Sequence, residues 1–164
     1  MSRIIGALVL AAMSIGCAPT VQLSVPEEDN TIALNAALMG AWRVEGMMQS
    51  DCPREWMRRL PTGHTRWTEE QGALVIESMA GDSETVTLHP VASNQLESEG
   101  ALTIHECTVT ETLRLDIDTL DGPWASGVYE AQLAHDGSPE CVALAVEAGV
   151  PDRCLTQLMW QARR

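Results

Sequence analysis

Five cysteines are the residues of this 164-residue chain whose chemistry depends most on their spacing. Cys17 directly follows an apolar N-terminal stretch, while Cys52, Cys107, Cys141 and Cys154 are spread through the rest of the chain. None of these four belongs to a Cys-x-x-Cys pair, so their spacing does not favour zinc binding or thioredoxin-type redox chemistry. An even number of cysteines in an oxidising compartment predicts two disulfides, with three pairings to choose from. We favour Cys141–Cys154 together with Cys52–Cys107.

The N-terminal segment has the order of an export signal. One cation, Arg3, precedes the apolar run Ile4–Met13, and small residues follow. As a helix this run covers about 15 Å, which is too short for a hydrocarbon core of roughly 30 Å. We therefore expect residues 1–16 to be a signal peptide rather than a permanent membrane span.

The stretch Ser14-Ile15-Gly16-Cys17 resembles the lipobox of bacterial lipoproteins. In that family the cysteine becomes the first mature residue and carries the acyl chains, palmitate among them, so the resemblance predicts a membrane anchor at Cys17. Ser14 departs from the usual leucine. Ala18 stands where a signal for retention in the inner membrane would have aspartate, which points to the outer membrane. The alternative is an ordinary secretory peptide that is cut near Ala18.

Three segments are expected: the signal peptide, a lipidated tether with a short helix over residues 17–39, and a β-barrel domain over residues 40–164. Ala18–Asn30 is polar and has no apolar period, which is typical of a tether. Thr31–Met39 is predicted as a short helix that Asn30 caps and Gly40 ends.

From Gly40 onward the pattern is mostly of period two, which predicts eight or nine short antiparallel strands. The clearest strand is Thr112–Asp118, in which leucine and isoleucine alternate with charged residues. Two helices are expected as interruptions, Cys52–Leu60 and Ser138–Ala148, and a buried strand over residues 141–146 competes with the second. The further expected strands are Ala41–Gly46, His64–Glu69, Ala73–Met79, Glu84–His89, Asn94–Ser98, Ala101–Cys107, Trp124–Ala134 and Cys154–Arg163, with Glu99-Gly100 as one of the turns.

The triplet Gly40-Ala41-Trp42 opens the first of these strands after a short helix. Here the chain resembles the lipocalin-like (calycin) barrels, whose first strand begins Gly-x-Trp. The resemblance implies an antiparallel meander barrel with one helix before the last strand, and an arginine, here Arg163 or Arg164, packed over the tryptophan. The four cysteines and the acidic composition are not hallmarks of that family, and a core tryptophan in another small β fold is the alternative.

If the barrel forms, its interior is the default site for a small apolar ligand. The same residues also describe a packed core, which we favour. The candidate ligand contacts are Trp42, Leu115, Tyr129 and Trp160, and the other residues expected to point inward are Leu113, Ile117, Ala131, Leu133 and Leu158.

Charge is distributed unevenly along the chain. The formal net charge is -13 and lysine is absent, which argues against nucleic-acid binding. Between residues 52 and 68, by contrast, four arginines face one glutamate, with two tryptophans among them. This Arg-rich loop could bind an anionic partner or lipid headgroups, or simply neutralise acids of the domain itself. Its arginines are Arg54, Arg58, Arg59 and Arg66.

Motifs for catalysis are not found in the sequence. The histidines are scattered, and no Gly-x-Ser-x-Gly, phosphate loop or dinucleotide fingerprint occurs. Paired acids such as Asp116 and Asp118 lie on the polar face of a strand, without the burial that separates pKa values for acid/base work. We therefore expect no metal, no cofactor and no enzyme. The sequence favours a non-enzymatic envelope lipoprotein of structural or binding type. The alternatives are a carrier of a small apolar ligand and an inhibitor or adaptor acting on another envelope protein through the Arg-rich loop.

Overall fold

The alternating residues beyond Gly40 form strands because successive side chains of a strand point to opposite faces of a sheet. In β6 (Cys107–Asp121), Leu113 and Leu115 are buried, whereas Arg114 between them is exposed. The computed structural model describes residues 34–53, 59–80, 85–104, 106–148 and 152–164. Its other strands are β1 (Gly40–Ser50), β2 (Gly63–Glu70), β3 (Ala73–Ser78), β4 (Thr85–Ala92), β5 (Gln95–Ile104), β7 (Trp124–His135) and β8 (Arg153–Arg163).

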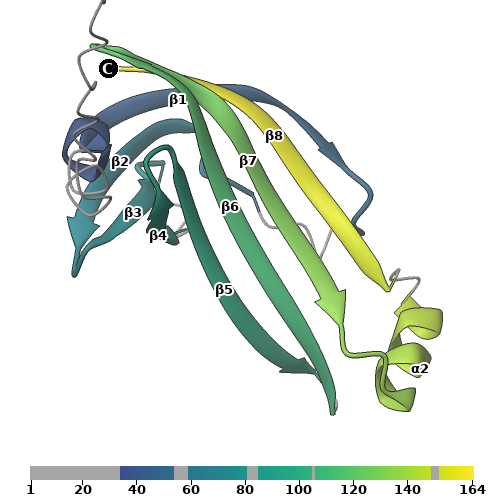
Figure 1. The fold of residues 1–164 in the computed structure, drawn as a ribbon. Helices are drawn as coiled ribbons and strands as arrows, with labels where there is room; N and C mark the ends of the chain where they lie inside the picture. Colours follow the sequence, from purple (N-terminus) through teal and green to yellow (C-terminus); the bar gives the residue numbers. More distant parts are fainter. Residues whose placement is uncertain (1–33, 54–58, 81–84, 105, 149–151) are drawn as a thin grey trace, which may run out of the picture.

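Each strand pairs antiparallel with the next one along the chain, and β8 also pairs with β1 (Figure 1). The closing ladder runs from Arg43 opposite Arg163 to Ser50 opposite Thr156. The helix α2 (Pro139–Ala148) lies between β7 and β8 in the chain. This arrangement confirms the predicted mainly β meander barrel with one helix before the last strand.

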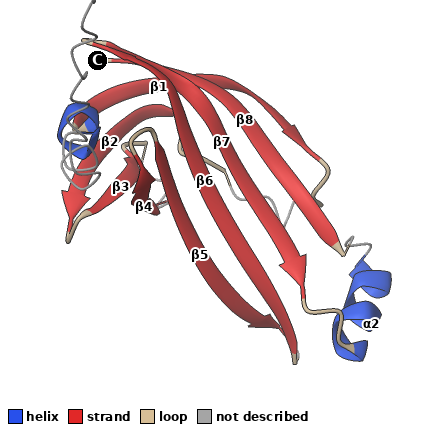
Figure 2. Ribbon diagram, in the orientation of Figure 1, coloured by secondary structure: helices blue, strands red, loops and turns tan. Residues whose placement is uncertain are grey.

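Two helical segments lie at opposite ends of the barrel (Figure 2). Residues 34–38 pack at the end where β1 begins and β8 finishes, which we call the closed end, and α2 lies at the other, the α2 end. The predicted helix Ser138–Ala148 is confirmed, since the Ser138 hydroxyl accepts a hydrogen bond from the N–H of Cys141 (3.3 Å) and caps α2. The predicted start at Asn30 and most of the predicted helix Cys52–Leu60 lie outside the described residues, and the described ends of the latter are not helical.

One predicted turn, at Glu99-Gly100, is wrong. The strand β5 passes through it and pairs continuously with β6, from Gln95 opposite Asp116 to Ile104 opposite Cys107. The chain reverses instead next to Glu106, which has a φ of 70°. Glycine permits a turn without requiring one, and a Cβ at Gly100 would meet nothing within 4 Å. The strands expected on either side of this turn are therefore one continuous strand, β5.

The buried core is centred on three tryptophans at the closed end. Trp67 lies between Trp42 and Trp160. The centre of its ring is 5.9 Å from that of Trp42 and 5.7 Å from that of Trp160, and the ring planes are tilted to one another. The indole N–H of Trp42 donates to the carbonyl of Leu38 (2.6 Å), and that of Trp67 donates to the hydroxyl of Thr65 (2.8 Å). These bonds allow two large rings to be buried together with their polar atoms.

A glycine in β7 makes room for the third ring. A Cβ built on Gly127 would lie 1.9 Å from the carbonyl oxygen of Asp116 and 3.1 Å from the Trp160 ring. The β6–β7 register shifts beside it, between Ile117 and Thr119. Glycine at this position therefore lets β6 approach closely while Trp160 packs against the wall of the barrel.

Both disulfides form, but with a pairing different from the one we favoured. Cys52 is bonded to Cys154, and Cys107 to Cys141. The predicted pairs would have joined the last helix to the last strand and the loop after the first strand to the middle of the sheet, whereas barrel closure brings the end of β1 beside the start of β8. The turn after β7 in the same way folds α2 back over the start of β6.

None of the described helices is long and apolar enough to cross a membrane.

Candidate functional site

The closed end of the barrel is held by an arginine at the C-terminus. The Arg164 guanidinium lies 4.5 Å from the centre of the Trp42 ring. It also donates hydrogen bonds to the carbonyl of Ala37, in the last turn of residues 34–38, and to that of Met39 just after it (3.1 Å for Met39). A cation over an aromatic face that also binds the carbonyls at a helix end stabilises both elements. This is the contact that the resemblance predicts for Arg163 or Arg164, and the structure assigns it to Arg164.

The predicted ligand contacts are brought together, but inside a packed cluster. Trp42, Leu115, Tyr129 and Trp160 are each between 0 and 4% exposed and belong to one hydrophobic core. The other residues expected to point inward join them, except Leu133, which packs against the small cluster of Cys107, Val109 and Cys141 at the α2 end. Within the described residues, the closed half of the barrel is therefore filled by its own side chains.

The inner face changes character towards the α2 end. The strand register places Glu111 on the same face of β6 as the buried Leu113, opposite Gly100 on β5 and Leu133 on β7. Glu111 and Leu133 are half-buried, and Gly100 is exposed. Ser98, one step closer to the core, is also half-buried. The α2 half of the interior is thus more polar and more accessible than the closed half.

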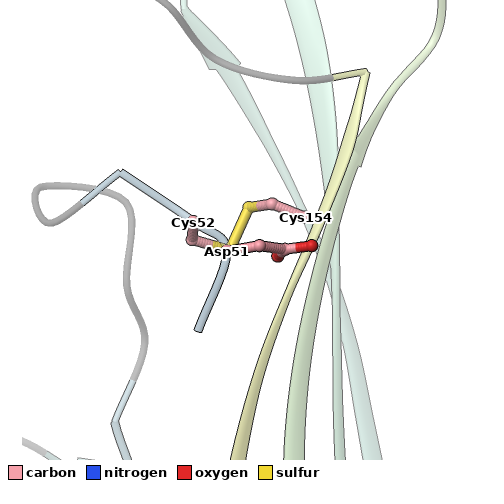
Figure 3. A group of neighbouring side chains, drawn as sticks. All are labelled: Asp51, Cys52 and Cys154. Atoms are coloured by element: carbon pink, nitrogen blue, oxygen red, sulfur yellow. A yellow bond between two sulfur atoms is a disulfide. The ribbon is translucent and has the colours of Figure 1, made fainter. Parts of the chain in front are cut away.

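One disulfide fastens the seam between the first and last strands (Figure 3). Next to Cys52, the Asp51 carboxylate accepts a hydrogen bond from the backbone N–H of Leu155 (2.6 Å), and the Asp51 N–H donates to the Leu155 carbonyl (3.2 Å). One residue earlier, the hydroxyls of Ser50 and Thr156 are 2.7 Å apart. The β1–β8 ladder therefore continues past the last strand pair as side-chain contacts and a covalent bond.

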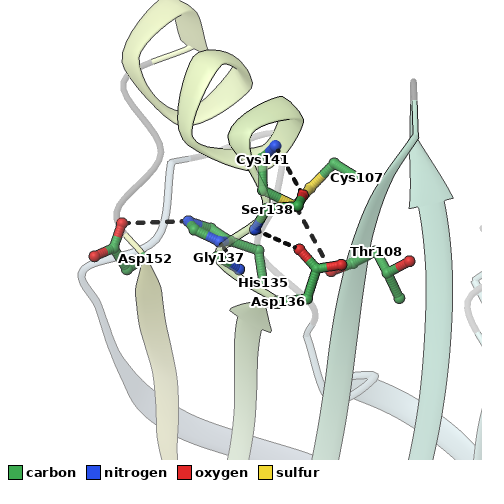
Figure 4. A network of polar contacts seen from close by, with 8 residues as sticks. All are labelled: Cys107, Thr108, His135, Asp136, Gly137, Ser138, Cys141 and Asp152. Carbon is green, nitrogen blue, oxygen red and sulfur yellow. Dashed lines mark hydrogen bonds and ion pairs between the residues drawn. A yellow bond between two sulfur atoms is a disulfide. The ribbon is translucent and has the colours of Figure 1, made fainter.

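The second disulfide pins the start of α2 to β6 (Figure 4). In the connecting turn the Asp136 carboxylate accepts a hydrogen bond from the backbone N–H of Ser138 (2.9 Å), and His135 Nε2 lies 3.2 Å from the carboxylate of Asp152. The hydrogen bond from the Ser138 backbone N–H lowers the pKa of Asp136 below its ordinary value, and the Ser138 hydroxyl is the next largest cause of this shift. A carboxylate at this position also stabilises the N-terminus of the helix.

Two groups of metal-type side chains occur in the part of the chain that the structure describes. One is Asp51 with Cys52 and Cys154, and the other is His135 with Asp136 and Cys141. Metal-binding cysteine is a thiolate, whereas the cysteine sulfurs here are bonded to one another. Neither group offers three metal ligands while its disulfide is intact.

The Arg-rich loop is only partly described. Arg54 and Arg58 lie outside the described residues, while Arg59 and Arg66 are exposed, Arg66 on β2. Two arginines outside this loop meet at the closed end instead, and one of them, Arg43, is not among the predicted site residues. Arg43 and Arg163 are opposite one another on β1 and β8, and both line two adjoining surface pockets of about 320 and 250 Å³. Only the strand register reveals this pair, because 120 residues of chain separate the two positions.

Comparisons with known proteins do not add a family. A scan against protein-family models, a search of curated proteins and a search of solved structures each find no match to this chain.

Proposed function

We propose that this protein is an exported envelope lipoprotein, anchored in the outer membrane through acylated Cys17, whose barrel is a rigid, non-enzymatic binding module. Two observations support export. The lipobox-like residues 14–17 follow a signal-type apolar run, and two disulfides are typical of proteins that fold in an oxidising, exported compartment.

The observation that carries the assignment of the barrel is its packed closed end. Arg164 over Trp42 supports kinship with the lipocalin-like barrels. The filled tryptophan core favours a scaffold that binds through its surface or rim over a hollow carrier. A packed core with two disulfides keeps such a surface in one conformation, which lowers the entropy lost on binding.

The anchor is tested by mass spectrometry of the protein purified from its own membrane. We expect cleavage before Cys17 and an added mass of acyl chains on that residue. Cys17→Ser should abolish both, whereas the neighbouring control Ala18→Ser should keep them. A wild-type protein cut near Ala18, with no acyl mass, would refute the anchor.

A carrier of a small apolar ligand is the second candidate, supported by the accessible inner face at the α2 end. Ser98 lies on this inner face and the adjacent Glu99 on the outer face, so the two make a matched pair. Ser98→Trp would fill the interior, and Glu99→Trp would add the same bulk outside. The carrier predicts that N-phenyl-1-naphthylamine binds the wild type and the Glu99 variant but not the Ser98 variant. Equal binding by all three would exclude it.

A further inference from the structure

A row of cationic and aromatic side chains crosses the outside of the barrel at the closed end. Trp124 on β7 is opposite Arg163 on β8, and Arg163 is opposite Arg43 on β1, so the three project from one face of neighbouring strands. The Arg163 guanidinium lies 5.6 Å from the centre of the Trp124 ring. Trp124 is 52% exposed, which is unusual for the largest apolar side chain.

A second row, four residues further along the same strands, is apolar, and the polar row of Glu45, Gln161 and Ser126 lies between the two. Met47 on β1 is opposite Met159 on β8, and Met159 is opposite Val128 on β7. The two methionines are 69 and 49% exposed. We call these two rows, from Trp124 to Met47, the β7–β8–β1 face. Large exposed apolar side chains on the same face as cations are typical of an interaction surface.

The groove within this face has the chemistry of an anion site beside an aromatic ring. It measures about 320 Å³ and is lined by Arg43, Arg163 and Trp124, together with Glu45 and Gln161. Glu45 pairs with Arg43 (Nε to Oε1, 2.8 Å), and both of these side chains are more than half exposed. Guanidinium groups bind phosphate oxygens through parallel hydrogen bonds, and each of these arginines has further N–H donors to offer.

The net charge of the protein does not oppose an anionic partner here. Glu97 and Glu99 on β5 project from the other side of the barrel, since β5 is four strands from β1 in either direction. Physiological salt screens charges beyond about 8–10 Å, so the near side is governed by its own residues. Among the described residues, the strand register places Glu45, which is paired with Arg43, and Asp121, which is opposite Trp124 in the β6–β7 hairpin, beside the row.

The place where the described chain begins favours one partner, a lipid surface. The described chain begins at the closed end, where Arg164 holds the carbonyls of Ala37 and Met39. The preceding 33 residues include the apolar run Ile4–Met13 and Cys17. The sequence predicts a polar tether over Ala18–Asn30, and a flexible coil of that length has ends on the order of 20 Å apart. An anchored chain therefore keeps the closed end close to the bilayer.

We propose that the β7–β8–β1 face lies on the anionic phospholipid surface to which the chain is tethered. Arg43 and Arg163 bind lipid phosphates, while Trp124 and the two methionines enter the interface, where tryptophan side chains are favoured. The identity of this membrane rests on the proposed lipid anchor, whereas the binding chemistry of the face does not.

The test uses the full chain carrying Cys17→Ser, so that no acyl chain contributes. Its partition is measured onto phosphatidylcholine vesicles that contain or lack phosphatidylglycerol. The ratio of the two cancels the contribution of the N-terminal apolar run. We compare Arg43→Gln/Arg163→Gln with Arg114→Gln/Arg153→Gln, a control with the same charge change, in which Arg114 lies on β6 and Arg153 at the start of β8, at the α2 end. Melting curves confirm that both variants fold.

We expect the face variant to lose roughly tenfold or more of its preference for anionic vesicles and the control to lose less than about threefold. In the same background, Met47→Gln/Met159→Gln should weaken binding to both vesicle types. Equal losses in the two arginine variants, or no preference for anionic vesicles in the parent, would overturn the proposal. It would also fail if soluble glycerol 3-phosphate bound the groove as tightly as the vesicles do, because the groove would then be a small-anion site. The acyl mass on Cys17 of the natural protein is measured separately, so the anchor and the face can fail independently.

Discussion

The two ends of the barrel are held together by different means. At the closed end, three tryptophans and a C-terminal arginine are packed without a covalent link. At the α2 end the buried cluster is small, consisting of Cys107, Val109 and Cys141, and both disulfides lie there. Disulfides are most frequent where a small core cannot supply enough burial. The end with the large aromatic core is therefore stabilised by packing, and the end with the small core is stabilised by disulfides.

The largest expected effect is at the seam. The Cys52→Ser/Cys154→Ser variant loses a link between residues 102 positions apart, and the chain-entropy model gives roughly 4–5 kcal/mol for it. The free energy of unfolding in urea measures the loss. A change below about 1 kcal/mol would show that side-chain contacts alone hold the α2 end together, and would contradict its dependence on disulfides.

The closed end should be almost as sensitive to the loss of a ring. Trp67 is 1% exposed and lies between the other two tryptophans, so Trp67→Ala should cost roughly 3–5 kcal/mol in unfolding free energy. The exposed Trp124→Ala is the matched control and should cost less than about 1 kcal/mol. Equal losses in the two variants would contradict the assignment of the core.

A smaller effect is expected from the arginine that covers the core. Arg164→Gln removes a cation over Trp42 and donors to two carbonyls, and should cost about 1–2 kcal/mol. Hydrogen exchange should rise first at residues 34–38, which lose their support. Arg163→Gln keeps the Arg164 contacts and serves as the control. Unchanged exchange at residues 34–38 would show that these residues are held by their leucines alone.

The smallest effect is a pH dependence at the α2 end. Because the pKa of folded Asp136 is lowered, its stabilising contribution is present above the ordinary value of 3.8 and is lost as the pH falls through the folded pKa. An NMR titration should give Asp136 a pKa below the ordinary value of 3.8. In Asp136→Asn the change in the amide chemical shift of Ser138 that follows this titration should disappear. An ordinary pKa at Asp136 would mean that the cap does not depend on the charge.

The sequence predicts those parts of the fold that depend on local pattern. The alternation of apolar and polar residues is enough to predict β6, because one face of that strand is buried and the other is exposed to solvent. The helix α2 follows from Ser138, Pro139 and Gly149, which are start and stop residues close to the helix itself. The turn at Glu99-Gly100 was predicted wrongly because glycine was taken as a turn signal in a place where β5 continues.

Local sequence pattern does not predict the features that depend on barrel closure. The disulfide pairing was predicted wrongly because Cys52 and Cys154 meet only when β8 pairs with β1. The Arg43–Arg163 pair was missed for the same reason, while the contact of Arg164 with Trp42 was anticipated only through the resemblance to a family. Register between distant strands is a property of the whole sheet, and single positions do not encode it.

The bond between Cys52 and Cys154 sets the order in which this chain can mature. A chain that emerges N-terminus first exposes Cys52 and Cys107 before either of their partners, since these are Cys154 and Cys141. Any oxidation at that stage joins two cysteines that the finished barrel keeps apart. The last strand also completes the sheet, so folding waits until almost the whole chain is out. Correct maturation therefore requires either delayed oxidation or a catalyst that exchanges disulfides.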